Sequence, residues 1–164
     1  MDVVTLGNER EGVLKEKATL ISDINEEIEK IVQAMIEAMI ESDGIGLAGP
    51  QVDYPKKIFI TRAPGDETRI FINPEIIQTS LDIVPYEEGC LSIPGVFAEI
   101  MRPEAITIQA WNEKGKPFRL DAEGILARVI QHEYDHLKGV LFIDHLNDKK
   151  KQRVLKMYNR RNNR

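Results

Sequence analysis

The sequence has a single cysteine, Cys90, among its 164 residues. It therefore forms no intrachain disulfide, and we expect the protein to work in a reducing compartment, the cytoplasm. Its first twelve residues carry four charged side chains where a secretory signal would be apolar, and no apolar run is long enough to span a membrane. Repeats and low-complexity segments are also missing. These absences argue against a secreted disulfide-rich protein and a membrane protein, and they favour one globular domain over residues 1–164.

Charge is distributed unevenly along the chain. The net charge is -5, yet residues 149–164 contain eight of the 22 Lys and Arg and none of the 27 acidic residues. We expect a basic C-terminal helix at about 148–164, whose charge suits an anionic partner such as ribosomal RNA. The alternative is a solvated helix that packs on the body of the protein through Val154, Leu155 and Tyr158.

Apolar residues at spacings of three and four predict an N-terminal helix from about Asn25 to Ser42. The following stretch, GIGLAGPQV at residues 44–52, formally matches the dinucleotide fingerprint G-x-G-x-x-G. That fingerprint follows a strand and opens a helix, whereas here a helix precedes it and Pro50 comes directly after the third glycine. We therefore expect no dinucleotide, and instead an extended backbone that approaches a ligand closely.

Strand-like segments follow in the middle of the chain. We expect them at residues 57–62, 69–72, 76–79, 105–111 and 116–120. The last two are joined by Asn-Glu-Lys-Gly, which predicts a hairpin. Several β segments with few helices predict an α+β fold.

The clearest chemical signal is His-Glu-x-x-His at residues 132–136. Two histidines four positions apart on a helix lie one turn above the other, so both imidazoles can bind one ion. Glu133 flanks that ion without binding it, which suits a carboxylate that takes a proton from water. The motif therefore predicts a metal site with an adjacent base.

The helix that carries this motif is expected at about residues 123–138, because Gly139 is a suitable C-terminal cap. Apolar residues at spacings of three and four continue into both histidines and into Glu133. The ion would therefore lie inside the molecule, beneath the sheets. Polar residues, including Arg128 and Gln131, take the other faces of this helix.

The third ligand does not follow the usual downstream pattern. Position 142 is Phe where one protease class has its third histidine, and no glutamate follows Glu133 for the other class. His145 remains, either as a structural histidine or as the fourth ligand of a closed zinc site. Cys90 is the best candidate for the third ligand, since two imidazoles and one thiolate leave a position open for catalysis. The alternative for Cys90 is a buried small hydrophobe.

Three motifs stand in order along the chain: GIGLAGPQ at residues 44–51, EGCLS at 88–92 and QHEYDH at 131–136. With these motifs the sequence resembles bacterial peptide deformylases over most of its length. The resemblance implies antiparallel or mixed β-sheets wrapped around a central HExxH helix, with an N-terminal and a C-terminal helix. It also implies an enzyme that removes the formyl group from the N-terminal formyl-methionine of new proteins and releases formate.

The resemblance further implies roles for individual residues. Cys90, His132 and His136 would hold the metal. Glu133 would accept a proton from the attacking water and deliver it to the leaving amine. The ion would be Fe²⁺ in the cell, with Zn²⁺, Ni²⁺ or Co²⁺ as alternatives in isolated protein. A metallopeptidase or another metal amidohydrolase with the same ligands is the alternative function.

The remaining implied roles concern the substrate. The amide of Gln51 and the main-chain N–H of Leu91 would stabilise the oxyanion, although Gln51 could instead only satisfy backbone groups in its own loop. Arg102 would pair with Glu88 and brace the cysteine loop. The residues expected to contact the peptide are Ile45, Gly46 and Gly89, which pair with its backbone, and Val129, which lines the methionine pocket.

The sequence departs from the family pattern at three places. Ala48-Gly49 stands where two alanines are usual, the start at residues 6–9 lacks the Gly-Asp-Pro turn, and Phe97 replaces an arginine that contacts the peptide in some members. Preference for the residues after methionine therefore does not transfer from the family to this chain.

Overall fold

The computed structural model describes residues 1–162. Its five-stranded sheet has the order β1-β2-β3-β6-β7, and its two-stranded ribbon consists of β4 and β5. The strands are β1 (Gly46–Ala48), β2 (Ile58–Thr61), β3 (Arg69–Thr79), β4 (Ile83–Cys90), β5 (Ile93–Pro103), β6 (Ala105–Trp111) and β7 (Pro117–Glu123). The helices are α1 (Glu26–Glu41), α2 (Gly124–His136) and α3 (Asp148–Asn162), with short 3-10 helices η1 (Glu11–Lys15), η2 (Gly49–Val52) and η3 (Phe142–His145).

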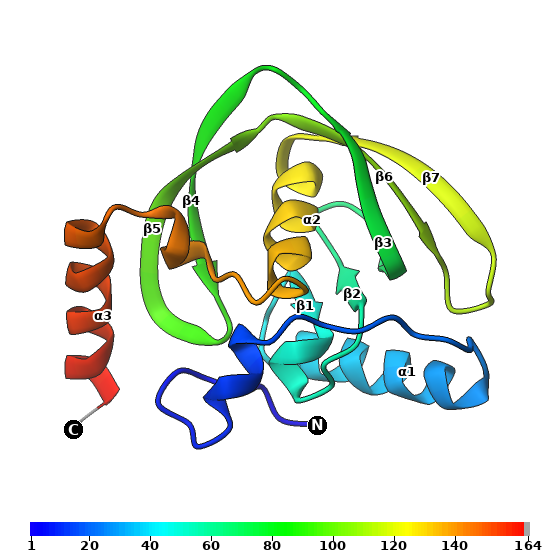
Figure 1. Cartoon of the computed structure of the whole chain (residues 1–164), viewed down its shortest axis with the longest axis horizontal. Coiled ribbons are helices and arrows are strands. Elements are labelled where there is room, and N and C mark those ends of the chain that lie inside the picture. The colour runs from blue at the N-terminus through cyan, green and yellow to red at the C-terminus, as the bar shows by residue number, and fades with distance from the viewer. Residues whose placement is uncertain (163–164) are drawn as a thin grey trace.

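Helix α2 lies at the centre, with the ribbon on one side and the larger sheet on the other (Figure 1). All pairings between these strands are antiparallel within the described residues. The predicted α+β arrangement, with sheets wrapped around the HExxH helix, is therefore confirmed. Within residues 1–162, no helix combines the length and the hydrophobicity needed to cross a bilayer.

The strand predictions were right for β2, β3, β6 and β7 of the larger sheet, and they missed the ribbon. Strand β6 has the predicted bounds, and the two segments predicted on either side of residues 73–75 form one strand, β3. The register of β3 shifts at Asn73, whose φ is 49° and whose side chain pairs with the main chain of Ile21. Strands β4 and β5 were missed, because prolines interrupt their sequences. A ribbon of two strands has free edges that tolerate proline.

The N-terminal helix α1 was predicted correctly. Its cap is Asn25, whose side-chain oxygen accepts from the main-chain N–H groups of Glu27 and Ile28 at 3.1 and 3.2 Å. The helix buries Val32, Met35, Met39 and their neighbours in a cluster that includes residues of β1 and β2. This cluster supports β1 from below and so fixes one wall of the site described next.

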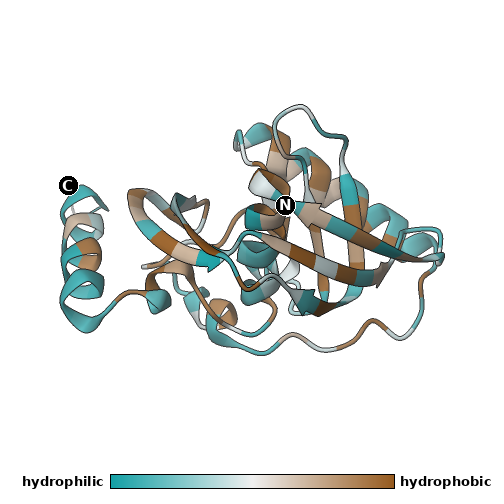
Figure 2. Ribbon diagram, turned by 90° about the horizontal axis from the view of Figure 1, so that it is seen from above, coloured by the Kyte–Doolittle hydropathy of each residue, from teal (hydrophilic) through white to brown (hydrophobic). Residues whose placement is uncertain are grey.

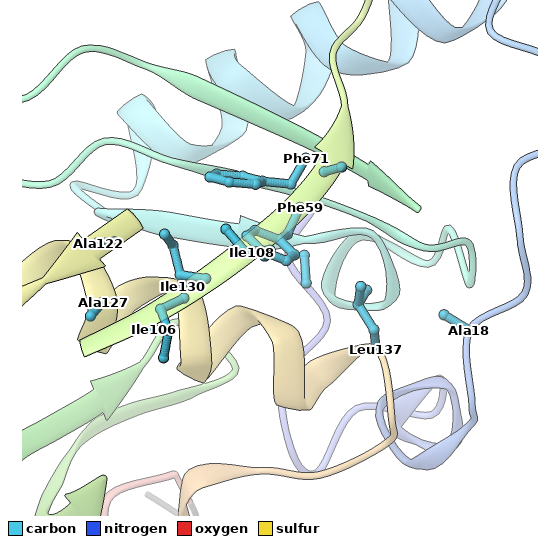
Figure 3. Packing of buried hydrophobic residues seen from close by; sticks show 11 residues of the cluster. Ala18, Phe59, Phe71, Ile106, Ile108, Ala122, Ala127, Ile130 and Leu137 are labelled. Atoms are coloured by element: carbon cyan, nitrogen blue, oxygen red, sulfur yellow. The ribbon is translucent and has the colours of Figure 1, made fainter. Parts of the chain in front are cut away.

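A second hydrophobic cluster packs α2 on the larger sheet (Figure 3). Phe59 of β2 and Phe71 of β3 stack with ring centroids 4.7 Å apart. Ile106 and Ile108 of β6 and Ile130 of α2 complete its centre, and all five side chains are nearly or fully buried. Side chains of this size contribute about 1.5–3 kcal/mol each when buried, so α2 is held firmly against the sheet.

The C-terminal helix begins at Asp148, as predicted, and is described to Asn162; the last two predicted positions lie outside the described residues. It is mostly hydrophilic (Figure 2). Tyr158 is buried, and Val154 and Leu155 pack against the cluster formed with β5 and η3. The helix therefore packs on the body through Val154, Leu155 and Tyr158, as expected. Most of its cations remain exposed.

Gly139, which follows α2, provides a test of how the N-terminal segment packs. Its φ is +75°, and an added Cβ would lie 2.5 Å from the carbonyl oxygen of Lys15. Gly65 has a similar φ of +80° in open space and is the matched control. The positive φ alone costs an alanine about 1–2 kcal/mol.

We expect Gly139→Ala to lower the free energy of unfolding, measured with urea, by about 1–3 kcal/mol more than Gly65→Ala does, because Lys15 must also move. Equal losses in the two variants would contradict the close packing at residue 139.

Candidate active site

The structure brings Cys90, His132 and His136 together. One ligand atom from each lies within 4.8 Å of the others, and the Sγ of Cys90 is 3.4 Å from Nε2 of His136. The cysteine ends β4, and the two histidines lie one turn apart on α2. Thiolate and imidazole are donors that divalent transition metals accept. These three residues could therefore hold one ion, as the sequence predicted.

Two further observations fit an ion at this place. The Nδ1 of His132 lies 2.9 Å from Oε1 of Glu88, an arrangement that holds the ring proton there and leaves Nε2 for a metal. Within residues 1–162, Oε1 of Glu133 is buried and has no hydrogen-bond partner. A buried carboxylate oxygen without a partner is costly unless a bound group satisfies it.

The carboxylate of Glu88 is hydrogen-bonded to three residues at once. Arg102 donates from Nε at 2.7 Å, Arg128 donates from Nη1 at 2.8 Å, and His132 is the third partner. Burial opposes the charge of Glu88, but the hydrogen bonds from His132 and Arg102 hold its pKa well below its usual range. The predicted pair of Arg102 and Glu88 is thus confirmed, and it extends to a histidine of the metal group.

Arg128 was not predicted to take part in the site. The sequence placed it on another face of the helix, yet it is buried, and Nη2 also donates to the carbonyl oxygen of Val84 at 2.7 Å. The missed ribbon covers this face of α2. The available signal was its position one turn before His132, on the side of the helix that carries the metal group.

Glu133 lies between the metal group and the backbone of β1. Burial raises its pKa to about 7, and a bound dication would lower that pKa again because it favours the carboxylate. An added Cβ on Gly46 would lie 2.5 Å from Oε2 of Glu133. Only glycine at residue 46 leaves the carboxylate this space.

Gln51 satisfies a backbone group of its own loop and also lies beside Cys90. Its Oε1 accepts from the main-chain N–H of Ala48 at 2.9 Å, and its Nε2 donates to Oγ of Ser92 at 3.1 Å and lies 3.5 Å from Sγ of Cys90. The loop was expected to be extended throughout, but only β1 is; residues 49–52 turn into η2. That turn is what directs Gln51 toward Cys90.

A pocket of about 460 Å³ opens over these residues. The predicted substrate contacts Ile45, Gly46, Gly89 and Val129 all line it, as do Gln51, Leu91 and Glu133. Phe97 is 61% exposed and Tyr86 44% exposed, and both line this pocket. A second hollow, of about 540 Å³, lies over β3, β6 and β7, and its lining contains no cysteine or histidine that could hold a metal with the three donors.

His145 is not a member of the metal group. Its Nε2 lies 2.7 Å from Oδ2 of Asp135, which also accepts from Nη1 of Arg102 at 2.8 Å. Within residues 1–162, the group of possible ligands has three members. The alternative of a closed structural zinc site that includes His145 is therefore wrong.

Comparison with known proteins agrees with this geometry. A family model described as polypeptide deformylase matches residues 1–152. Peptide deformylase 1 of Clostridium perfringens is 52% identical over 134 residues, which cover 81% of this chain and 90% of the relative. The peptide deformylase of Borreliella burgdorferi is 46% identical over 149 residues, 90% of each chain. The crystal structure of a peptide deformylase from Synechococcus elongatus in complex with actinonin superposes with a TM-score of 0.89 at 40% identity and covers 96% of this chain and 85% of that one.

Glu88→Gln tests the support of the metal group. The amide is neutral and balances Arg102 and Arg128 poorly, and it accepts less strongly from His132. We expect metal affinity, measured by competition with a chelator, to fall by about 10- to 100-fold. Glu87→Gln removes the same charge from the exposed neighbouring residue and serves as the control. The role given to Glu88 would be refuted if both variants bound metal equally well.

Proposed function

The chain belongs to the polypeptide deformylase family and removes the formyl group from the N-terminus of new polypeptides; on that premise we propose which of its residues carry out the reaction. Cys90, His132 and His136 hold a divalent ion. The observation that carries this assignment is the group of three donors beside the buried, unpartnered oxygen of Glu133. When bound, the ion supplies Lewis acidity to the formyl carbonyl and to water.

The donor set accepts several ions. Two imidazoles and a thiolate suit Fe²⁺, Zn²⁺, Ni²⁺ and Co²⁺. We propose Fe²⁺ as the ion used in the cell. The reason is the resemblance of the three motifs to those of the family, which implies Fe²⁺. The lowered pKa of His136, which burial causes, supports a neutral ring that is ready to bind a metal.

Glu133 is the general base and then the general acid. It takes a proton from the water that attacks the formyl carbon, and it delivers that proton to the nitrogen of the leaving methionine. Its burial in the pocket lining, on the same turn of α2 as His132 and His136, supports proton transfer at this carboxylate. The negative charge that develops on the formyl oxygen is stabilised by the Gln51 amide and the Leu91 N–H.

The peptide binds along the free edges on the two sides of the pocket. Among the strands of residues 1–162, β1 is at the end of its sheet and β4 pairs with β5 alone, so each has an unpaired edge. Ile45 and Gly46 on one side and Gly89 on the other supply main-chain groups to an extended substrate. Val129 lies against Gly46 and lines the space for the methionine side chain.

We also propose that residues 1–164 form one catalytic domain that acts in the cytoplasm. Two of the three hydrophobic clusters share strands β1, β2 and β3, and the salt bridges of Glu88 with Arg102 and Arg128 join the ribbon to α2, which supports a single unit. The substrate is a chain still in synthesis, so the enzyme must be present where ribosomes translate.

Glu133→Gln is the direct test of the acid-base assignment. The variant keeps the size of the side chain but cannot carry the proton, so we expect formate release from a formyl-methionyl peptide to fall by about 10²- to 10⁴-fold. Metal content, measured on the same sample, should be unchanged. Glu99→Gln, on an exposed part of β5, controls for the loss of charge. Near-normal turnover in the Glu133 variant would disprove the assignment.

The same assay separates the deformylase from a metallopeptidase. A metallopeptidase with these ligands would release amino acids from unformylated peptides, whereas the proposed site releases only formate. Amine release from an unformylated peptide at a rate comparable to formate release would favour the alternative.

Helix α3 is the proposed contact with the ribosome. Exposed cations on this helix include Lys149, Lys150, Arg153, Lys156 and Arg160. Such a row neutralises RNA phosphates, and its binding weakens as salt increases.

We expect replacement of these five cations by glutamine to reduce co-sedimentation with ribosomes by about tenfold or more at low salt, and to leave turnover of a short free peptide unchanged. Replacement of five exposed acidic residues on α1 is the control. Ribosome binding that persists in the α3 variant would exclude this helix as the contact.

A further inference from the structure

The first residues of the chain connect the two loops that carry the proposed oxyanion donors. The main-chain N–H of Val4 donates to the carbonyl oxygen of Gln51 at 2.6 Å, and the N–H of Leu6 donates to the carbonyl oxygen of Ser92 at 2.9 Å. Ser92 directly follows Leu91. Residues 4–6, called the strap below, therefore span the gap between the Gln51 loop and the cysteine loop.

A side-chain hydrogen bond also joins the Gln51 loop directly to the cysteine loop. The amide of Gln51 donates to Oγ of Ser92 at 3.1 Å. The strap, Gln51 and Ser92 thus form a ring of hydrogen bonds, and Gln51 and Ser92 are almost fully buried. Buried hydrogen bonds of this kind leave the two loops little freedom to separate.

Helix α3 holds the strap from its other side. The hydroxyl of Tyr158 donates to the carbonyl oxygen of Leu6 at 2.6 Å, and only 3% of Tyr158 is exposed. The chain turns immediately afterwards, where the N–H of Asn8 donates to the carbonyl oxygen of Thr5 and Gly7 has a φ of +92°. Both ends of the strap are therefore fixed.

We propose that the strap is a positioning element that sets the distance between the Gln51 amide and the Leu91 N–H. This inference rests on the proposed function, in which these two groups stabilise the oxyanion. Donors of this kind act only when they are placed correctly in advance, and an error of about 1 Å in such a site can cost about 100-fold in rate. Among the described residues, none of residues 4–6 belongs to the metal group or lines the substrate pocket.

The test removes one N–H of the strap. Leu6 is the second residue of a turn whose third residue, Gly7, has a positive φ, and proline is favoured at that place in a type II turn. Leu6→Pro therefore deletes the donor to Ser92 in a backbone that accepts proline. Leu6→Ala is the reference, because it loses the leucine side chain as well but keeps the N–H.

We expect kcat for a formyl-methionyl peptide to be about tenfold or more lower in Leu6→Pro than in Leu6→Ala, with KM and metal content the same in both. Equal kcat values would overturn the proposal. Loss of formate release in the unaltered enzyme would instead refute the proposed function, so the two failures are distinguishable.

Tyr158→Phe gives a second measurement that does not depend on the proline variant. It removes one hydroxyl and keeps the buried ring. A kcat about threefold or more below that of the unaltered enzyme, at unchanged KM and metal content, supports the strap. A normal kcat in Tyr158→Phe, if Leu6→Pro does not fold, overturns it.

Discussion

The buried carboxylate of Glu88 is the constraint on which the site depends. It lies on β4, yet its partners are Arg102 on β5 and Arg128 and His132 on α2. A ribbon of two strands is marginally stable by itself, and this ion cluster attaches it to the central helix. If one member of such a cluster is removed, a buried charge is left without its partner. The resulting loss of stability is far larger than the net stabilisation that the intact pair provides.

In this arrangement the same side chains hold the fold together and orient the metal group. The bond that orients His132 toward an ion also joins the ribbon to α2. Cys90 ends the ribbon strand that carries Glu88, so correct docking of β4 brings the thiol to the histidines. A chain that folds with the ribbon displaced would retain its larger sheet but would have no metal group.

The sequence predicted the parts of this site that depend on local spacing. The turn of α2 that carries His132, Glu133 and His136 follows from helix periodicity, and the lack of the usual downstream ligands made Cys90 the best candidate for the third ligand. The sequence did not predict β4 and β5, because prolines at residues 85, 94 and 103 read as breaks.

With the ribbon missed, the burial of Arg128 could not be foreseen, nor could the contact between Gln51 and Ser92. These depend on which segments meet in space, which spacing along one chain does not contain. The same holds for β3, where a single residue in a left-handed conformation, Asn73, lets the strand continue past a proline.

The contact between Tyr158 and Leu6 joins residues that are 152 positions apart in the chain. During synthesis the N-terminal residues leave the ribosome first, so the strap exists for most of translation without the hydroxyl that holds it. Contacts of such high sequence separation form late, because the long intervening loop must close before they are made. An enzyme that processes unfinished chains would thus acquire its own final geometry only when its last helix has been made.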